Sequence, residues 1–172
     1  GTSSNVYPDY FSVGVKMTSG GSIASTSGTV KMTGSKGIYS SYAIEQDDNS
    51  ATSIVSAPAG LEVVATYGRV SMVGLNNVGK LAGDVRSGFV FDNGGRNLAV
   101  DSVNGRLGFS ATSTSAIGLY NIGTLTFNES LNATGSSSIA LYANEMAIAA
   151  GKLIGKSSDS VDVMLSPSAR YG

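Results

Sequence analysis

The strongest constraint in this sequence is a short phrase that returns at regular intervals near its C-terminal end. Ile117–Tyr120 reads Ile-Gly-Leu-Tyr, Ile139–Tyr142 reads Ile-Ala-Leu-Tyr, and Val161–Met164 reads Val-Asp-Val-Met. Each step is 22 residues long, and Thr124–Phe127 matches Met146–Ala149 at the same offset. Alternating apolar residues bounded by Gly, Ser and Asn are typical of short, half-buried strands. A strand-only unit repeated at a fixed period predicts a β-solenoid, in which successive coils stack on one another.

The register of the repeat predicts which side chains fill the interior. Ile117, Ile139 and Val161 hold the same position in successive units, so we expect them to form one inward ladder. Tyr120 and Tyr142 are expected to form a second, aromatic ladder. Adjacent coils should lie about 4.8 Å apart, as neighbouring strands do in a sheet.

The predicted fold class is all-β, a right-handed parallel β-helix with about 22 residues per coil in its C-terminal part. We expect residues 1–172 to form a single solenoid domain. Asn144–Ala150 could form a short helix, but its register with Thr124–Phe127 favours a strand. Neither end resembles a cap, because strand character continues to Leu165, so we expect a segment of a longer rod.

A smaller motif recurs through the middle of the chain. It consists of Gly, a polar or basic residue, Leu or Val, any residue, and a large apolar residue. It occurs as Gly28–Met32, Gly68–Met72, Gly105–Phe109 and Gly123–Phe127. Gly allows the positive φ of a tight corner, so each copy is predicted to start a strand whose third and fifth residues face inward. The basic residue of the motif fits a solvated outer face better than a ligand clamp.

The periodic pattern breaks between Ala43 and Gly60, which predicts an excursion from the solenoid wall. The most acidic run of the chain lies inside it and includes Glu45, Asp47 and Asp48. Insertions at solenoid corners often carry binding surfaces, so these three residues are the candidate binding site, for a basic or cationic partner surface. The alternative is a longer loop without a binding role.

Composition excludes several classes of chemistry. The chain contains no Cys, His or Trp. These absences remove thiol catalysis, thiolate metal sites and the commonest general base. We therefore predict no enzyme activity, no catalytic residue, no metal and no cofactor. A net charge of −1 gives no basic field that would attract nucleic acid, so nucleic acid is not an expected partner.

The repeated phrases Gly-Thr-Leu-Thr-Phe, Ala-Ile-Gly-Leu-Tyr and Ser-Ile-Ala-Leu-Tyr-Ala-Asn resemble the passenger regions of Gram-negative autotransporter adhesins. The likeness in motif covers Ile117 to Leu165. It implies a parallel β-helix that is secreted to the bacterial cell surface and adheres to host cells or other bacteria. The implied partner is a surface protein or glycan, and membrane contact would come only through a C-terminal barrel outside this sequence.

Two alternatives stay open, and the first is a polysaccharide-processing or polysaccharide-binding β-helix of the lyase or tailspike kind. Asp159 and Asp162 stand three residues apart, and β-helical polysaccharide lyases and tailspikes use carboxylate clusters for Ca²⁺ or for acid/base chemistry. Surface Asp residues in turns are the simpler explanation for this pair. The other alternative is a filament subunit that associates end to end through uncapped coils.

Overall fold

A computed structural model of the chain describes residues 13–18, 20–37, 40–46, 54–112, 116–134, 138–155 and 162–167. Within these ranges the regular elements are eighteen β-strands. In chain order they are β1 (Val15–Met17), β2 (Ser22–Ala24), β3 (Val30–Gly34), β4 (Tyr42–Gln46), β5 (Ile54–Ala57), β6 (Leu61–Ala65), β7 (Arg69–Met72), β8 (Leu75–Val78), β9 (Lys80–Val85), β10 (Phe89–Asp92), β11 (Leu98–Val100), β12 (Ser102–Val103), β13 (Arg106–Leu107), β14 (Phe109–Thr112), β15 (Ile117–Phe127), β16 (Leu131–Thr134), β17 (Ile139–Ile148) and β18 (Val163–Ser166).

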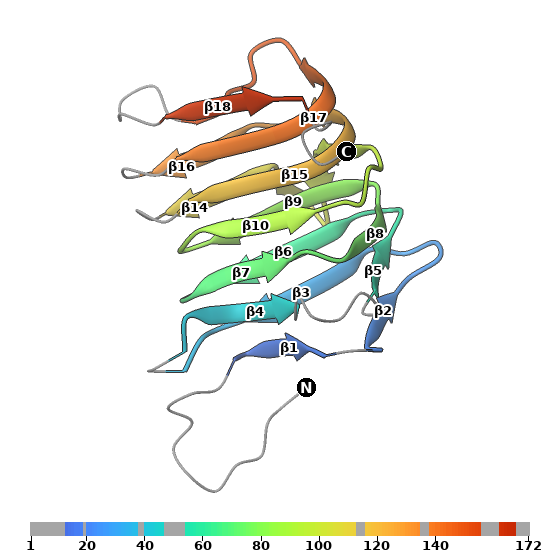
Figure 1. The fold of residues 1–172 in the computed structure, drawn as a ribbon, viewed down its shortest axis with the longest axis vertical. Coiled ribbons are helices and arrows are strands. Elements are labelled where there is room, and N and C mark those ends of the chain that lie inside the picture. The colour runs from blue at the N-terminus through green and yellow to red at the C-terminus, as the bar shows by residue number, and fades with distance from the viewer. Residues whose placement is uncertain are drawn as a thin grey trace, which may run out of the picture.

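The strands pile up in parallel stacks along the long axis of the molecule (Figure 1). One stack runs β1, β4, β7, β10, the first half of β15, the first half of β17, and β18. A second runs β2, β5, β8, and a third runs β3, β6, β9, β14, β16. The second halves of β15 and β17 form a further short stack with β11. The predicted all-β fold of stacked parallel strands, the arrangement of a β-solenoid, is confirmed.

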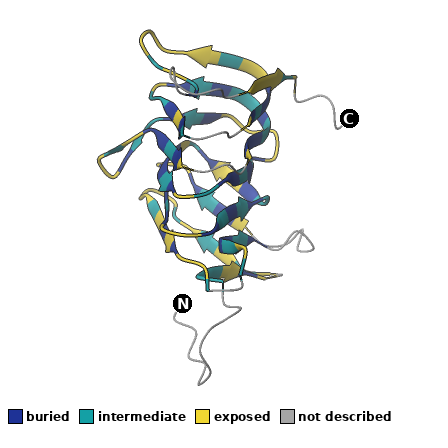
Figure 2. Ribbon diagram, turned by 90° about the vertical axis from the view of Figure 1, so that its left-hand side faces the viewer, coloured by how far each residue is buried: buried dark blue, intermediate teal, exposed yellow. Residues whose placement is uncertain are grey.

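Side chains in register form continuous columns inside the stack, where the buried residues gather (Figure 2). The main inward column of the first stack consists of Val15, Ile44, Val70, Phe89, Ile117, Ile139 and Val163. Three phenylalanine rings pack together in the middle of the core. The ring centroid of Phe89 lies 4.4 Å from that of Phe109 and 5.1 Å from that of Phe91. Gly83 makes room for this cluster, because a Cβ there would lie 2.6 Å from the Phe109 ring.

The predicted ladder is confirmed for Ile117 and Ile139, which are direct register partners, and both are buried. Its third rung is wrong, because Ile139 pairs with Val163, whereas the predicted partner Val161 lies outside the described residues. A shift of two residues keeps every side chain on the same face of a strand. The alternation of apolar residues therefore cannot distinguish Val161 from Val163 as the partner of Ile139. The length of the chain between β17 and β18 determines which of the two pairs with it.

The second half of the repeat is shifted by one residue from its predicted register. Thr124 pairs with Glu145, and Leu125 pairs with Met146. A bulge between Leu119 and Ile122 absorbs the difference, and Asn121 within it has a φ of 52°. An odd shift exchanges the two faces of a strand, so Met146 packs over Leu125 and not over Thr124. The prediction of a strand rather than a helix after Asn144 is confirmed.

The recurrent Gly motif precedes a strand at Gly28, Gly68 and Gly105, but the copy at Gly123 lies inside β15, so the prediction that each copy starts a strand is wrong there. Of these four glycines, Gly68 and Gly105 have the predicted positive φ. The apolar positions of the motif are buried at Val70, Met72, Leu125 and Phe127. The copy at Gly105 differs, because Leu107 is 69% exposed. Asn104 and Gly105 both have positive φ and turn the chain into the antiparallel hairpin β12–β13. Such Asn-Gly turns are the preferred connection of two-residue hairpins.

The predicted excursion is wrong at both of its ends. Its first residues belong to β4, where Ala43 and Ile44 are buried, and Ile54–Ala57 form β5 within the second stack. The sequences of β4 and β5 lack the repeated phrase, yet both strands contribute buried side chains to the core. Residues 47–53 lie outside the described residues.

We expect Ile139→Asp to lower the free energy of unfolding by at least about 3 kcal/mol, because it places an unpaired charge in the interior column. Leu107→Asp is the control, since that side chain is exposed and its replacement should change stability little. Urea unfolding followed by circular dichroism measures both. Equal midpoints for the two variants would contradict the position of Ile139 in the core.

Candidate functional site

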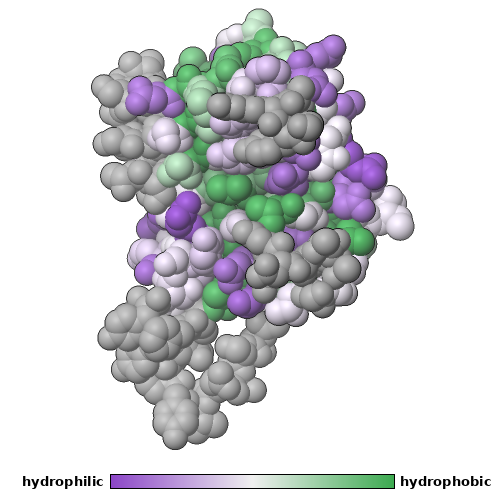
Figure 3. Space-filling view, viewed as in Figure 1, coloured by the Kyte–Doolittle hydropathy of each residue, from purple (hydrophilic) through white to green (hydrophobic). Residues whose placement is uncertain are grey.

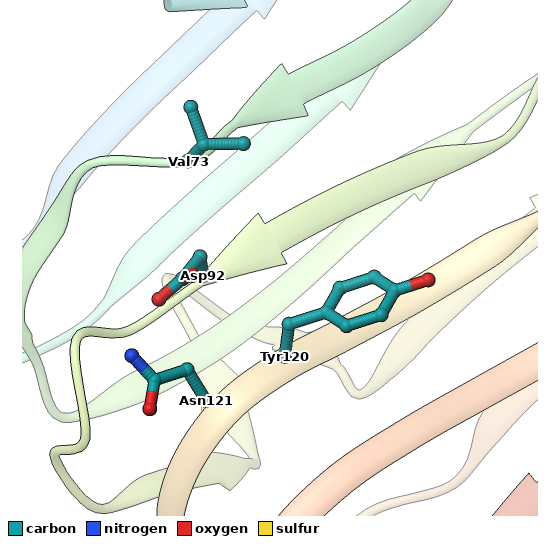
Figure 4. Close-up of a pocket in the computed structure, with 4 residues that line it drawn as sticks. All are labelled: Val73, Asp92, Tyr120 and Asn121. Atoms are coloured by element: carbon teal, nitrogen blue, oxygen red, sulfur yellow. The ribbon is translucent and has the colours of Figure 1, made fainter. Parts of the chain in front are cut away.

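A groove opens on the outer side of the first stack, at the corner where its strands end. It has a volume of about 340 Å³ and is lined by Val73, Asp92, Tyr120 and Asn121 (Figure 4). All four residues are half-buried. They come from three successive layers: Val73 directly follows β7, Asp92 ends β10, and Tyr120 and Asn121 lie at the bend of β15.

Strand register explains why these side chains meet. Phe91 pairs with Met72 and with Leu119, and all three are buried in the interior. Because side chains alternate along a strand, the next residue in each layer points outward. Those residues are Val73, Asp92 and Tyr120, and they form one outer column.

Hydrogen bonds between the two neighbouring corners hold the floor of the groove. Gly95 N donates to the Asn121 carbonyl at 2.7 Å, and Asn93 N donates to the Tyr120 carbonyl at 3.3 Å. Asp92 Oδ1 accepts a bond of 2.8 Å from Gly94 N. These bonds fix both corner backbones, so the groove is formed before any ligand arrives.

Tyr120 lines one side of the groove, and its ring is supported by Tyr142 in the next layer. The rings of Tyr120 and Tyr142 stack with centroids 4.9 Å apart and planes 19° apart, so the predicted aromatic ladder is confirmed. Tyr120 lies between the layer of Asp92 and the layer of Tyr142. Its ring also leans back over Gly118, where any side chain would clash with it. The ring is therefore held in one orientation.

The groove combines an apolar end, an aromatic wall, one carboxylate and one amide. Such a set suits non-covalent recognition, because apolar surface supplies contact and a few polar groups fix orientation. Among the residues that the structure describes, no group of three or more acidic side chains is arranged to hold a metal ion.

A second polar cluster lies on the outer side of the third stack, beneath the hairpin β12–β13. Glu62 is 2% exposed, and its carboxylate accepts bonds from Asn104 Nδ2 at 3.0 Å and Arg106 Nε at 3.1 Å. Lys31 Nζ lies 3.2 Å from the same carboxylate. Burial raises the pKa of Glu62, but these three partners outweigh it and hold the pKa below its ordinary value.

This second cluster fastens the hairpin to earlier layers. Thr29 Oγ1 donates to Asn104 Oδ1 at 2.6 Å, and Val103 packs on Gly60, where a Cβ would lie 2.9 Å from the valine. The hairpin thus connects to β6 and to the residue before β3. Every donor around Glu62 comes from the protein itself, so we assign the cluster a structural role. Arg106, the basic residue of the motif at Gly105, lies on the outer side with its side chain 36% exposed and pairs with Glu62.

The predicted acidic site is only partly within the described residues. Glu45 lies in β4, points outward, and forms an ion pair with Lys16 at 3.4 Å. Asp47 and Asp48 lie outside the described residues, as does Asp159. Asp162 precedes β18, and its carbonyl accepts a bond of 2.8 Å from Ile139 N. The structure therefore does not bring Glu45 together with other described acids.

Sequence reasoning missed the groove. The only signal was the repetition of Tyr120 as Tyr142, which predicted a ladder but not a cavity beside it. Asp92 belongs to a layer whose spacing does not follow the 22-residue period, since Phe89 pairs with Ile117 across 28 residues. Nothing in the local sequence therefore placed Asp92 beside Tyr120.

Comparisons with protein-family models, curated proteins and solved structures gave no match to this chain. No helix in the described part of the chain is long and apolar enough to cross a lipid bilayer.

The stability of the protein should depend on pH through Glu62. Its pKa is lower in the folded state than the ordinary 4.5, so its contribution is present above that pH and is lost as the pH falls further. Glu62→Gln should cost about 1–3 kcal/mol at pH 6, because it removes charge-assisted bonds. The difference from the parent protein should shrink at pH 3. Thermal and urea unfolding at both pH values measure it.

The control for this experiment is Glu129→Gln. Glu129 pairs with Lys152 at 2.8 Å, and both side chains are more exposed than that of Glu62. Its replacement should cost less than about 1 kcal/mol. A Glu62→Gln variant that differs from the parent equally at pH 6 and pH 3 would contradict an ionised, hydrogen-bonded Glu62.

Proposed function

We propose that the protein is a secreted adhesive β-solenoid, a segment of a rod on a bacterial cell surface that binds a surface protein or glycan through its side. The lateral groove at Tyr120 carries this proposal, because it offers a preformed site on the outside of the stack. The resemblance of Ile117–Leu165 to autotransporter passenger regions supports the location and the adhesive role.

For the coils we propose a right-handed winding with about 22 residues each in the C-terminal part. Two register pairs at this spacing support the coil size: Ile117 with Ile139 in the first stack and Phe109 with Leu131 in the third. A right-handed path is the rule for connections between parallel strands of one sheet, and this supports the handedness.

Binding without turnover fits the groove better than catalysis does. Glycoside hydrolysis uses a pair of carboxyl groups that flank the scissile bond. Asp92 is the one carboxylate that lines this groove within the described residues, and its neighbours are an amide, a phenol ring and Val73. These groups position a ligand but offer no acid/base pair.

We expect fluorescently labelled protein to bind saturably to cultured epithelial cells or to bacterial cells, with an excess of unlabelled protein competing. Flow cytometry measures the bound fraction, and labelled serum albumin is the control. Binding no greater than that of albumin on every cell type tested would contradict the adhesin proposal. Release of reducing or unsaturated ends from acidic polysaccharides, with or without Ca²⁺, would favour the enzyme alternative instead.

A specific observation also favours end-to-end association as a second function. Val163, Met164 and Leu165 in β18 are 41%, 46% and 57% exposed, although Val163 and Leu165 continue inward columns. Among the described strands, β18 pairs with β17 alone. Hydrophobic side chains gather at this upper end of the molecule (Figure 3). A second copy stacked on β18 would bury them.

We expect the mass of the protein in sedimentation equilibrium to rise with concentration. Leu165→Asp should keep it monomeric, because a charge would then face the joining layer. Leu107→Asp, on the hairpin, should leave association unchanged. A mass that stays monomeric at every concentration would contradict this second function.

A further inference from the structure

We propose that the groove formed by Val73, Asp92, Tyr120 and Asn121 binds a neutral saccharide, with a sugar ring seated between Val73 and the Tyr120 ring. This inference rests on the proposed adhesive function and names the ligand class of the same site.

The apolar surfaces of the groove suit the C–H faces of a sugar ring. A pyranose ring presents C–H groups on its faces, and these pack on aromatic and aliphatic side chains. Tyr120 supplies a large surface at a small cost in conformational entropy, because its side chain has two rotatable angles and Tyr142 and Gly118 already hold it. Val73 supplies apolar contact two layers away, on the far side of Asp92.

The polar groups of the groove suit the hydroxyl groups of a sugar. A sugar hydroxyl both donates and accepts, so neighbouring hydroxyls need a mixed set of partners. The Asp92 carboxylate accepts, with one oxygen already oriented by Gly94 N. The Asn121 amide both donates and accepts, and it lies close to Asp92 in the groove (Figure 4). Together they can hold two adjacent hydroxyls.

The size and direction of the groove favour a short glycan over a folded partner. Its volume of about 340 Å³ lies near the lower end of small-ligand sites, which span about 300–1,000 Å³. The lining residues follow the rod axis across three layers, or about 10 Å at the usual strand spacing. One or two sugar units of a longer chain would fit along this column.

A cation is the competing ligand, since tyrosine rings and a carboxylate also attract ammonium groups. An ammonium group has no hydrogen-bond acceptor, however, and would leave the Asn121 amide donors without a partner in the groove. Asp92 is also partly satisfied by Gly94 N. These two features favour a neutral, hydroxyl-bearing ligand.

Saturation-transfer NMR with the methyl glycosides of glucose, galactose, mannose and N-acetylglucosamine tests the proposal. We expect at least one glycoside to bind the parent protein, with the strongest saturation on ring protons. Tyr120→Leu and Asp92→Asn should each weaken that binding by about tenfold or more, as buried anchor residues do at binding sites. Choline serves as the cationic probe.

Matched controls come from residues that do not line the groove. Tyr67→Leu replaces a tyrosine that is 58% exposed, and Asp84→Asn replaces an acid on β9, so neither should change glycoside binding. Asp92→Asn keeps the shape of the side chain, and unchanged thermal unfolding would show that it folds. No glycoside binding by the parent, equal binding by Tyr120→Leu and Asp92→Asn, or binding of choline alone would each overturn the proposal.

The same variants separate this inference from the adhesin proposal. If the parent protein adheres to cells but adhesion is unaffected by glycosides and by both groove variants, the saccharide site is wrong and adhesion stands. If the glycosides bind through Tyr120 and Asp92 but the protein adheres to no cell, adhesion is wrong and the saccharide site stands.

Discussion

Every layer of this molecule must place an apolar side chain in the same interior slot as the layers on either side of it. The column from Val15 to Val163 meets this requirement seven times, once in each strand of the first stack. Changes in volume are balanced between neighbouring layers, as when Gly83 accommodates the Phe109 ring. Because a lone layer exposes its apolar side, stability comes from contact between layers and not from any one strand.

The same register that fills the interior also composes the outer surface. Once Phe91 is stacked between Met72 and Leu119, the following residues of those layers must form an outward column. Asp92 and Tyr120 are 28 residues apart in sequence and adjacent in space for this reason. The groove is thus a consequence of core packing, and its chemistry depends on which residues follow the buried ones at the corner.

The sequence predicted the parts of the fold that depend on local alternation and on exact repetition. Ile117 and Ile139 satisfied both conditions. Val163 could not be chosen over Val161, because an even shift preserves the inward face. The bulge at Asn121 could not be predicted from the sequence, because a corner can accommodate one extra residue without a break in the apolar pattern. The groove and the hairpin contacts of Glu62 depend on layers of unequal length, which no fixed period reveals.

Variation in layer length is concentrated at corners, and the polar features of the molecule lie there too. The long interval between Phe89 and Ile117 contains both the corner at Asp92 and the hairpin β12–β13. The hairpin uses its extra residues to cover Glu62 and to reach back to Thr29, which ties this layer to two earlier ones. It therefore restrains the layer that carries Asp92. The hairpin residues therefore tie the stack together at Glu62 instead of loosening it.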